Sequence, residues 1–328
     1  MARETLERYQ VLIYLTAIAA GLLVGWYVPE IAGPCEVLLW PTLGLLLLAT
    51  FTQVPLTHVR DAFRDRDFMA AVLIGNFIAI PLLVAGLISF LPNDPALRLG
   101  VLLVLLVPCT DWFITFTHLG RGDTGRAIAV TPVNLIVQLL MLPFYLWLFL
   151  GNAFFELLAA DKLLAVFVTL IMLPLFAAWM IERWVDLGPE RNRLIARIGA
   201  LPVALLALVV FLIAASQIEA AVNALSVLGA VVEIFIAFLI AALLLGLILA
   251  RIFRLPSASA RALIYSLGTR NSFVVLPLAL ALPAAWAPAI VVIVLQSLVE
   301  LFGMVAYLWL VPRLVADTEE SDQRTSSS

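Results

Sequence analysis

The most constraining feature of this sequence is a series of long, almost uninterrupted apolar runs. A helix needs about 20 mainly apolar residues to cross the hydrocarbon core of a bilayer. Ten segments meet this requirement, at approximately residues 10–28, 37–57, 68–91, 97–118, 125–150, 161–184, 197–216, 226–250, 259–282 and 286–312. The runs are apolar on all sides and do not alternate with period two, so they indicate helices and not the strands of a barrel. We therefore predict an all-α membrane protein with ten transmembrane helices.

The composition and the placement of the cations agree with a membrane location. The chain is 64% hydrophobic and 12% charged, whereas a soluble domain is roughly 45–50% apolar and 25% charged. If the N-terminus is cytoplasmic, only Arg98 and Lys162 fall in outer loops and Arg270 falls within a span. The other sixteen cations are cytoplasmic: Arg3, Arg8, Arg60, Arg64, Arg66, Arg121, Arg126, Arg183, Arg191, Arg193, Arg197, Arg251, Arg254, Arg261, Arg313 and Arg324. This asymmetry predicts a multi-pass protein of the cell (inner or plasma) membrane with both termini in the cytoplasm.

The chain divides into two halves of five spans each. Residues 1–158 form the first predicted repeat and residues 159–315 the second, and the polar residues 316–328 are expected to be a disordered cytoplasmic tail. An odd number of spans per half gives the halves opposite orientations. The fourth span of each half is interrupted, by VPCTD at positions 107–111 and by LGTRNS at positions 267–272. Matching interruptions in two inverted repeats indicate a transport site near the midplane of the membrane.

Two charged residues lie within these interruptions. Asp111 belongs to the first and Arg270 to the second. An ionised side chain within the membrane is costly, so each is expected to face a polar interior and to have a partner. We infer that the two side chains approach each other or share a ligand. The alternative is a structural ion pair that only holds two helices together.

Other polar residues of the interruptions are candidates for binding. Cys109 offers a thiol that can bind a soft metalloid, although a buried cysteine often serves only as a small apolar side chain. Thr110, Asn271 and Ser272 supply hydroxyl and amide groups that can line a cavity or satisfy the broken backbone.

Two carboxyl groups are candidates for carrying protons. One is Asp111 itself and the other is Glu300, in the last predicted span. Three further polar residues of predicted spans can act either as contacts between helices or as cavity lining: Asn76, Asn134 and Gln138.

These residues resemble those of a known transporter family. Pro-Cys-Thr at positions 108–110, followed by an apolar helix and LGRGD at 119–123, resembles the fourth span of the arsenical-resistance permeases of the bile acid:sodium symporter superfamily. Gly268, Asn271, Ser272 and Phe273 are similar to the broken ninth span of that superfamily, and Leu-Val-Glu at 298–300 resembles the tenth span of the arsenite permeases. The resemblance implies ten spans in two five-span repeats, with crossing fourth and ninth spans. It also implies that Cys109 binds trivalent arsenic during export.

The sequence also departs from the family pattern. Val274 stands where the arsenite permeases have a glutamate, Asp111 replaces a small apolar residue, and Arg270 replaces an uncharged residue. The sodium ligands of the sodium-coupled branch align with Phe113 and Ile114 in the fourth span and with Ser266 and Arg270 in the ninth. Phe113 and Ile114 carry no side-chain oxygen, so we expect no family-type sodium site and, in its place, either proton coupling or uniport.

The sequence therefore predicts a secondary transporter that exports arsenite or a related metalloid oxyanion, with protons as the coupling ion. The alternative is a carrier of a small organic anion, with Arg270 as the clamp for its carboxylate. A metalloid carrier should require the Cys109 thiol, whereas an organic-anion carrier should tolerate serine there. A third class, an intramembrane enzyme or sensor, has no supporting motif, and we expect no enzymatic activity, no cofactor and no nucleic-acid partner.

Overall fold

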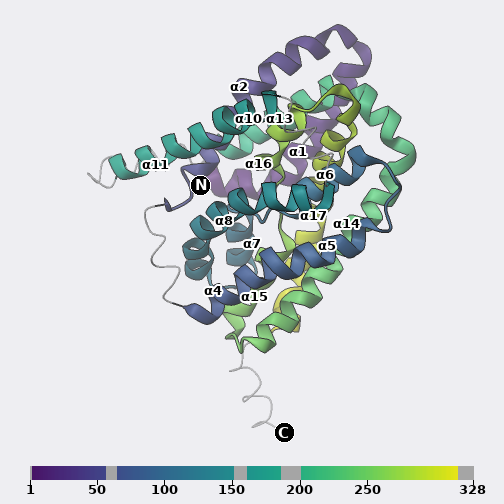
Figure 1. Cartoon of the computed structure of the whole chain (residues 1–328). Coiled ribbons are helices and arrows are strands. Elements are labelled where there is room, and N and C mark those ends of the chain that lie inside the picture. The colour runs from purple at the N-terminus through teal and green to yellow at the C-terminus, as the bar shows by residue number, and fades with distance from the viewer. Residues whose placement is uncertain (1, 57–64, 151–160, 186–200, 317–328) are drawn as a thin grey trace.

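The computed structural model describes residues 2–56, 65–150, 161–185 and 201–316 (Figure 1). Within these ranges the chain is helical, and its one strand-like feature is an isolated antiparallel bridge between Pro108 and Arg270. The predicted boundary between the two halves and the polar tail from residue 317 onwards lie outside the described residues.

Six described helical stretches are long and apolar enough to cross a membrane. They are Pro29–Phe51, Arg66–Ile88, Thr124–Phe149, Leu164–Trp184, Leu228–Ile252 and Ala284–Leu314. Shorter apolar helices cover Leu12–Tyr27, Pro95–Leu105 and Leu201–Ser216. The prediction of an all-helical, multi-pass membrane protein is thereby confirmed, with apolar surface on many helices facing outwards.

The helices follow one another along the chain without strands between them. Their bounds are α1 Ala2–Tyr27, α2 Ala32–Phe51, α4 Arg66–Ile74, α5 Ile80–Ile88, α6 Pro95–Leu105, α7 Trp112–Leu119, α8 Thr124–Leu150, α10 Asp161–Val166, α11 Leu173–Val185, α13 Leu201–Ser216, α14 Ile218–Ile252, α15 Ser257–Gly268, α16 Ser272–Leu280 and α17 Pro288–Leu314. Short 3-10 turns, η1 Pro29–Ile31 and η6 Ala284–Trp286, precede α2 and α17.

Two π-helical turns interrupt otherwise continuous spans. The turn η3 at Gly75–Ala79 joins α4 to α5, and η4 at Phe167–Met172 joins α10 to α11. Each is followed by a proline, Pro81 or Pro174, at the second position of the next helix. Proline has no amide hydrogen and therefore removes one hydrogen bond of the α-helical ladder, which favours a local change in hydrogen-bond pattern.

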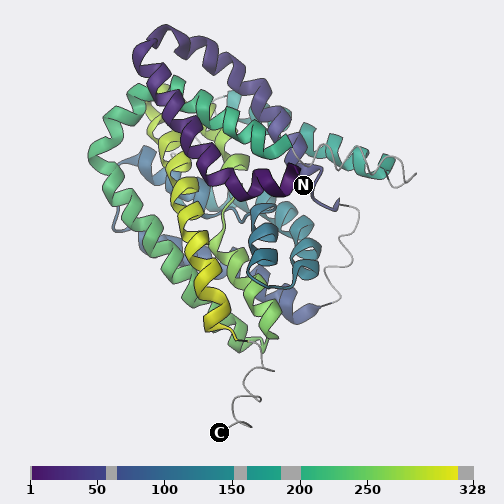
Figure 2. The same ribbon diagram turned by 180° about the vertical axis from the view of Figure 1, so that it is seen from behind.

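The helices form two groups that pack mainly within themselves. In one group α1 and α2 pack against α13, and α11 packs against α2. In the other group α6, α7, α8, α14, α15 and α17 pack together. The views from both sides show α2 and α13 at one end of the molecule and α4 and α15 at the other (Figures 1 and 2). The helix α16 contacts members of both groups.

The two predicted interruptions lie against each other in the second group. Helix α6 ends at Leu105 and α7 begins at Trp112, whereas α15 ends at Gly268 and α16 begins at Ser272. The amide of Cys109 donates to the carbonyl of Thr269 at 3.2 Å, and the amide of Asn271 donates to the carbonyl of Val107 at 2.8 Å. The predicted adjacency of the two segments is confirmed. We call this meeting point of residues 106–111 and 269–271 the crossing.

The guanidinium of Arg270 holds the helix ends at the crossing together. It donates to the carbonyl oxygens of Ser266 at 2.9 Å and Leu267 at 2.8 Å, near the end of α15, and to that of Leu105 at 3.4 Å, at the end of α6. It also donates to Oδ1 of Asn76 in η3 at 2.8 Å. Free carbonyl groups at a helix C-terminus carry partial negative charge and attract cations. The side chain is 3% exposed.

The alternative expectation, a structural ion pair between Arg270 and Asp111, is wrong, whereas a ligand shared by the two residues stays a prediction. Among the described residues no ion pair joins the two side chains. The guanidinium points towards neutral oxygens and lies 5.5 Å from the centre of the Phe238 ring. The sequence could not show this because the acceptors are backbone carbonyls, which every residue type carries.

Replacing Asn76 by leucine is expected to destabilise the protein. The Arg270 guanidinium would remain buried with one acceptor fewer, which costs about 1–3 kcal/mol. Thermal unfolding of the purified protein in detergent should show a lower midpoint for Asn76→Leu. The control is Thr169→Ala, which removes an exposed hydroxyl bonded to the Ala165 carbonyl of its own helix. Equal midpoints for Asn76→Leu and the unchanged protein would contradict this role.

Candidate functional site

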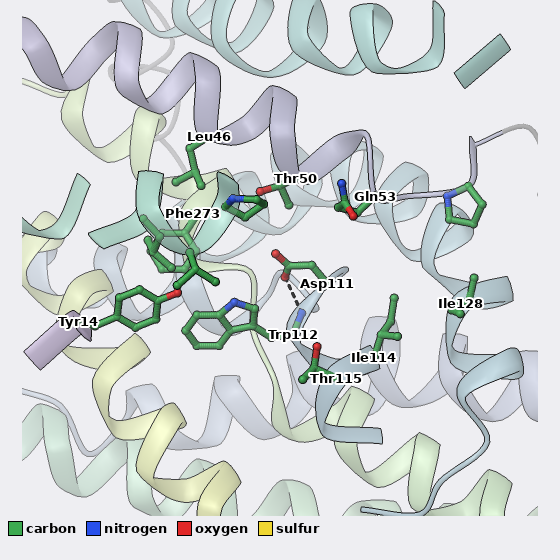
Figure 3. A pocket seen from close by; sticks show the side chains of 14 residues that line it. Tyr14, Leu46, Thr50, Gln53, Asp111, Trp112, Ile114, Thr115, Ile128 and Phe273 are labelled. Carbon is green, nitrogen blue, oxygen red and sulfur yellow. Dashed lines mark hydrogen bonds between the residues drawn. The ribbon is translucent and has the colours of Figure 1, made fainter. Parts of the chain in front are cut away.

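A cavity of about 290 Å³ lies between the two groups of helices (Figure 3). One wall comes from α1, α2, the residues after α2, and α13; the other comes from α7, α8, α16 and the crossing. This volume is close to the lower limit for small-molecule sites, about 300 Å³. The lining residues are Tyr14, Leu46, Thr50, Gln53, Pro55, Asp111, Trp112, Ile114, Thr115, Ile128, Pro202, Val203, Leu206 and Phe273.

Asp111 is the charged residue of this lining. It caps the N-terminus of α7, where its Oδ1 atom accepts the amide hydrogen of Trp112 at 2.7 Å. Both the capping bond and the helix dipole favour a carboxylate at this position. The residue is partly buried, and its side chain lies in the space between Thr50, Gln53, Trp112 and Phe273 (Figure 3).

The thiol of Cys109 lies behind this carboxylate. Its Sγ atom donates to Oδ1 of Asp111 at 3.1 Å, and the residue is 3% exposed. Cys109 is absent from the cavity lining, so a solute in the cavity reaches Asp111 before it reaches the thiol. No group of three or more metal-binding side chains occurs among the described residues, so this thiol acts there with at most one neighbouring carboxylate.

Glu300 lies on the other side of the crossing, in α17. Its Oε2 atom accepts the backbone amide of Arg270 at 2.8 Å and the side-chain amide of Gln296 at 2.7 Å. Gln296 in turn accepts the hydroxyl of Ser272 at 2.6 Å. Gln296 was not predicted from the sequence, although its position one helical turn before Glu300 places it on the same helix face.

The remaining predicted site residues also meet at the crossing. The side-chain amide of Asn271 donates to the hydroxyl of Thr110 at 3.1 Å, which links the two interruptions. Asn76 bonds both Arg270 and Ser266, at 2.8 and 3.1 Å, and so belongs to the support of the crossing. Asn134 and Gln138 are buried in α8, and their side-chain amides have no protein partner among the described residues.

Three aromatic rings of the cavity were not anticipated from the sequence. The rings of Tyr14 and Trp112 stack with their centres 5.9 Å apart and their planes 4° apart. The ring centres of Phe273 and Trp112 lie 5.9 Å apart, and the planes of the two rings form an angle of 58°. They come from α1, α7 and α16, so only the tertiary packing brings them together.

Comparisons with known proteins agree with this architecture. Over 154 residues the chain is 27% identical to the arsenical-resistance protein Acr3 of Corynebacterium glutamicum, which covers 44% of this chain and 42% of that protein. Over 190 residues it is 25% identical to an uncharacterised protein of Pseudomonas aeruginosa, covering 56% of this chain and 57% of the relative. The aligned part thus spans about half the length of these relatives.

A match to a family profile covers more of the chain. The profile of the sodium bile acid symporter family matches residues 40–238, which is more than half of the sequence. The match begins within α2 and includes the interruption between α6 and α7. The chain therefore belongs to the sodium bile acid symporter family.

Proposed function

We propose that this protein is a secondary transporter that exports arsenite or a related trivalent metalloid oxyanion in exchange for protons. The observation that carries the proposal is the Cys109 thiol at the crossing, hydrogen-bonded to an Asp111 carboxylate that lines the cavity. The similarity to a relative named as an arsenical-resistance protein supports the same cargo.

The chemistry of the thiol suits this cargo. Sulfur is a soft ligand that favours soft metals and metalloids. When arsenite in its trihydroxide form binds one thiol, an arsenic–sulfur bond forms and one arsenic–oxygen bond breaks. The thiol proton and the released hydroxide leave together as water. Asp111 is placed to relay the thiol proton to the leaving hydroxide because its Oδ1 atom already takes a hydrogen bond from Sγ. A single thiol also permits release on the other side.

Coupling to protons is supported by the balance of charges around the crossing. Arg270 contributes one positive charge, whereas Asp111 and Glu300 contribute two negative charges when both are ionised. Unbalanced charge within the membrane is costly. Uptake of one proton by either carboxyl group neutralises the set, which makes Asp111 and Glu300 the proposed proton carriers.

The proposed topology has ten spans in two inverted repeats, with both termini cytoplasmic in the cell membrane. Support comes from the two interrupted helices, α6–α7 and α15–α16, which occupy the same order in each predicted half and meet antiparallel. The sixteen cations on the predicted cytoplasmic side support the orientation.

The organic-anion alternative has no comparable support. Its proposed clamp, Arg270, already donates to four protein oxygens and does not line the cavity. No described contact therefore favours Arg270 as a substrate ligand.

Cys109→Ser is expected to abolish metalloid transport while the protein still reaches the membrane. Serine keeps a donor for Asp111 but offers no sulfur to arsenic. Uptake of arsenite into everted vesicles should fall to the background of vesicles without the protein. The matched control is Cys35→Ser, which replaces the other free cysteine, in α2, and should leave uptake unchanged. Full uptake by Cys109→Ser would exclude the metalloid proposal.

Transport is expected to depend on protons and not on sodium. Replacing sodium by potassium in the same vesicles should leave arsenite uptake unchanged, since Phe113 and Ile114 offer no side-chain oxygen to a sodium ion. A protonophore should reduce uptake because it removes the driving force. A strict requirement for sodium would overturn the proposed coupling.

A further inference from the structure

The cavity has an electrostatic character that the metalloid proposal does not use. Among the described residues, its lining contains one carboxylate and no lysine, arginine or histidine. The buried Arg270 lies behind the crossing, and both of its terminal guanidinium nitrogens donate to protein oxygens. A solute in the cavity therefore meets negative potential, which attracts cations and repels anions.

One oxygen of Asp111 is available to such a solute. Oδ1 accepts two hydrogen bonds, from Trp112 and Cys109. Oδ2 has no hydrogen-bond or ion-pair partner among the described residues, and it is not one of the buried unpaired atoms. Together with the place of Asp111 in the lining, this leaves Oδ2 accessible from the cavity.

Aromatic rings stand beside this oxygen. Trp112 follows Asp111 directly in the chain. The ring centre of Phe273 lies 5.9 Å from that of Trp112, and the ring of Tyr14 stacks on the ring of Trp112. Trp112 and Phe273 are partly exposed, and both border the space that the Asp111 side chain enters (Figure 3). A cation within about 6 Å of a ring centre is attracted by the negative face of the ring, and tryptophan is the strongest partner.

We propose that the cavity binds a small organic ammonium ion. Its positive charge pairs with Oδ2 of Asp111, and its alkyl groups pack against Trp112 and Phe273. The combination of a carboxylate with aromatic rings suits a substituted ammonium better than a hydrated metal ion, because rings replace water poorly as metal ligands but attract alkylated cations. The proposal does not depend on metalloid export, since it uses the carboxylate and the rings and not the thiol.

Choline is a suitable probe because it is a quaternary ammonium small enough for a cavity of about 290 Å³. Isothermal titration of the full-length protein in detergent should show saturable choline binding. The neutral isostere with carbon in place of the ammonium nitrogen should bind at least about tenfold more weakly, because it loses both the ion pair and the cation–π attraction. A carboxylate of the same size should not bind.

Substitutions of the lining residues test whether choline binds in this cavity. Asp111→Asn keeps an N-cap residue but removes the charge, and should weaken choline binding at least about tenfold. Trp112→Leu and Phe273→Leu should each weaken it about threefold to tenfold. The matched controls are Glu233→Gln and Phe302→Leu, which change exposed side chains of α14 and α17 away from this cavity and should leave affinity unchanged.

Several results would overturn the proposal. They are the absence of choline binding, equal binding of the neutral isostere, and unchanged affinity in Asp111→Asn. If Asp111→Asn fails to fold, Asp111→Ser takes its place, because serine also caps a helix. The comparison of choline with its neutral isostere in the unchanged protein then tests independently whether the cavity recognises the positive charge. Failure of arsenite transport with intact choline binding would separate this site from the metalloid proposal.

Discussion

The pairing of backbone groups at the two interrupted helices is the constraint on which the rest of the structure depends. Where a helix breaks in apolar surroundings, its free amide and carbonyl groups have no water to bind and each unpaired group is costly. Here the interruptions pair with each other, through the bonds of Cys109 with Thr269 and of Asn271 with Val107. Pro108 contributes no amide hydrogen that would need a partner. The two helix breaks are stable because their free backbone groups form hydrogen bonds with each other.

The side chains at the crossing follow from this pairing. Carbonyl groups at the ends of α6 and α15 point inwards and are satisfied by the guanidinium of Arg270. The start of α7 offers amide hydrogens and carries Asp111 as its cap. A cation therefore lies at the helix C-termini and a carboxylate at a helix N-terminus, as the helix dipoles favour. Of these two charged groups the carboxylate faces the cavity and the guanidinium does not, so the described part of the lining presents negative charge to a solute.

The sequence predicted those features that depend on composition and local order. The apolar runs indicated helices, and the polar clusters at 107–111 and 267–272 indicated the interruptions and their adjacency. The sequence did not predict features that depend on tertiary contacts. The hydrogen-bond partners of Arg270, for example, are carbonyl groups and Asn76, and not Asp111. The contact between the rings of Tyr14, Trp112 and Phe273 was also not predicted, because these residues lie on three helices that are distant in sequence.

In the proposed mechanism the cargo binds at the crossing through the sulfur of Cys109. X-ray absorption spectroscopy at the arsenic edge, on the purified protein loaded with arsenite, tests it most directly because it reports which atoms are bonded to arsenic. We expect an arsenic–sulfur bond in the unchanged protein and in Cys35→Ser, and only arsenic–oxygen bonds in Cys109→Ser. A spectrum of the unchanged protein with oxygen neighbours alone, or a sulfur neighbour that persists in Cys109→Ser, would show that Cys109 does not bind the arsenic.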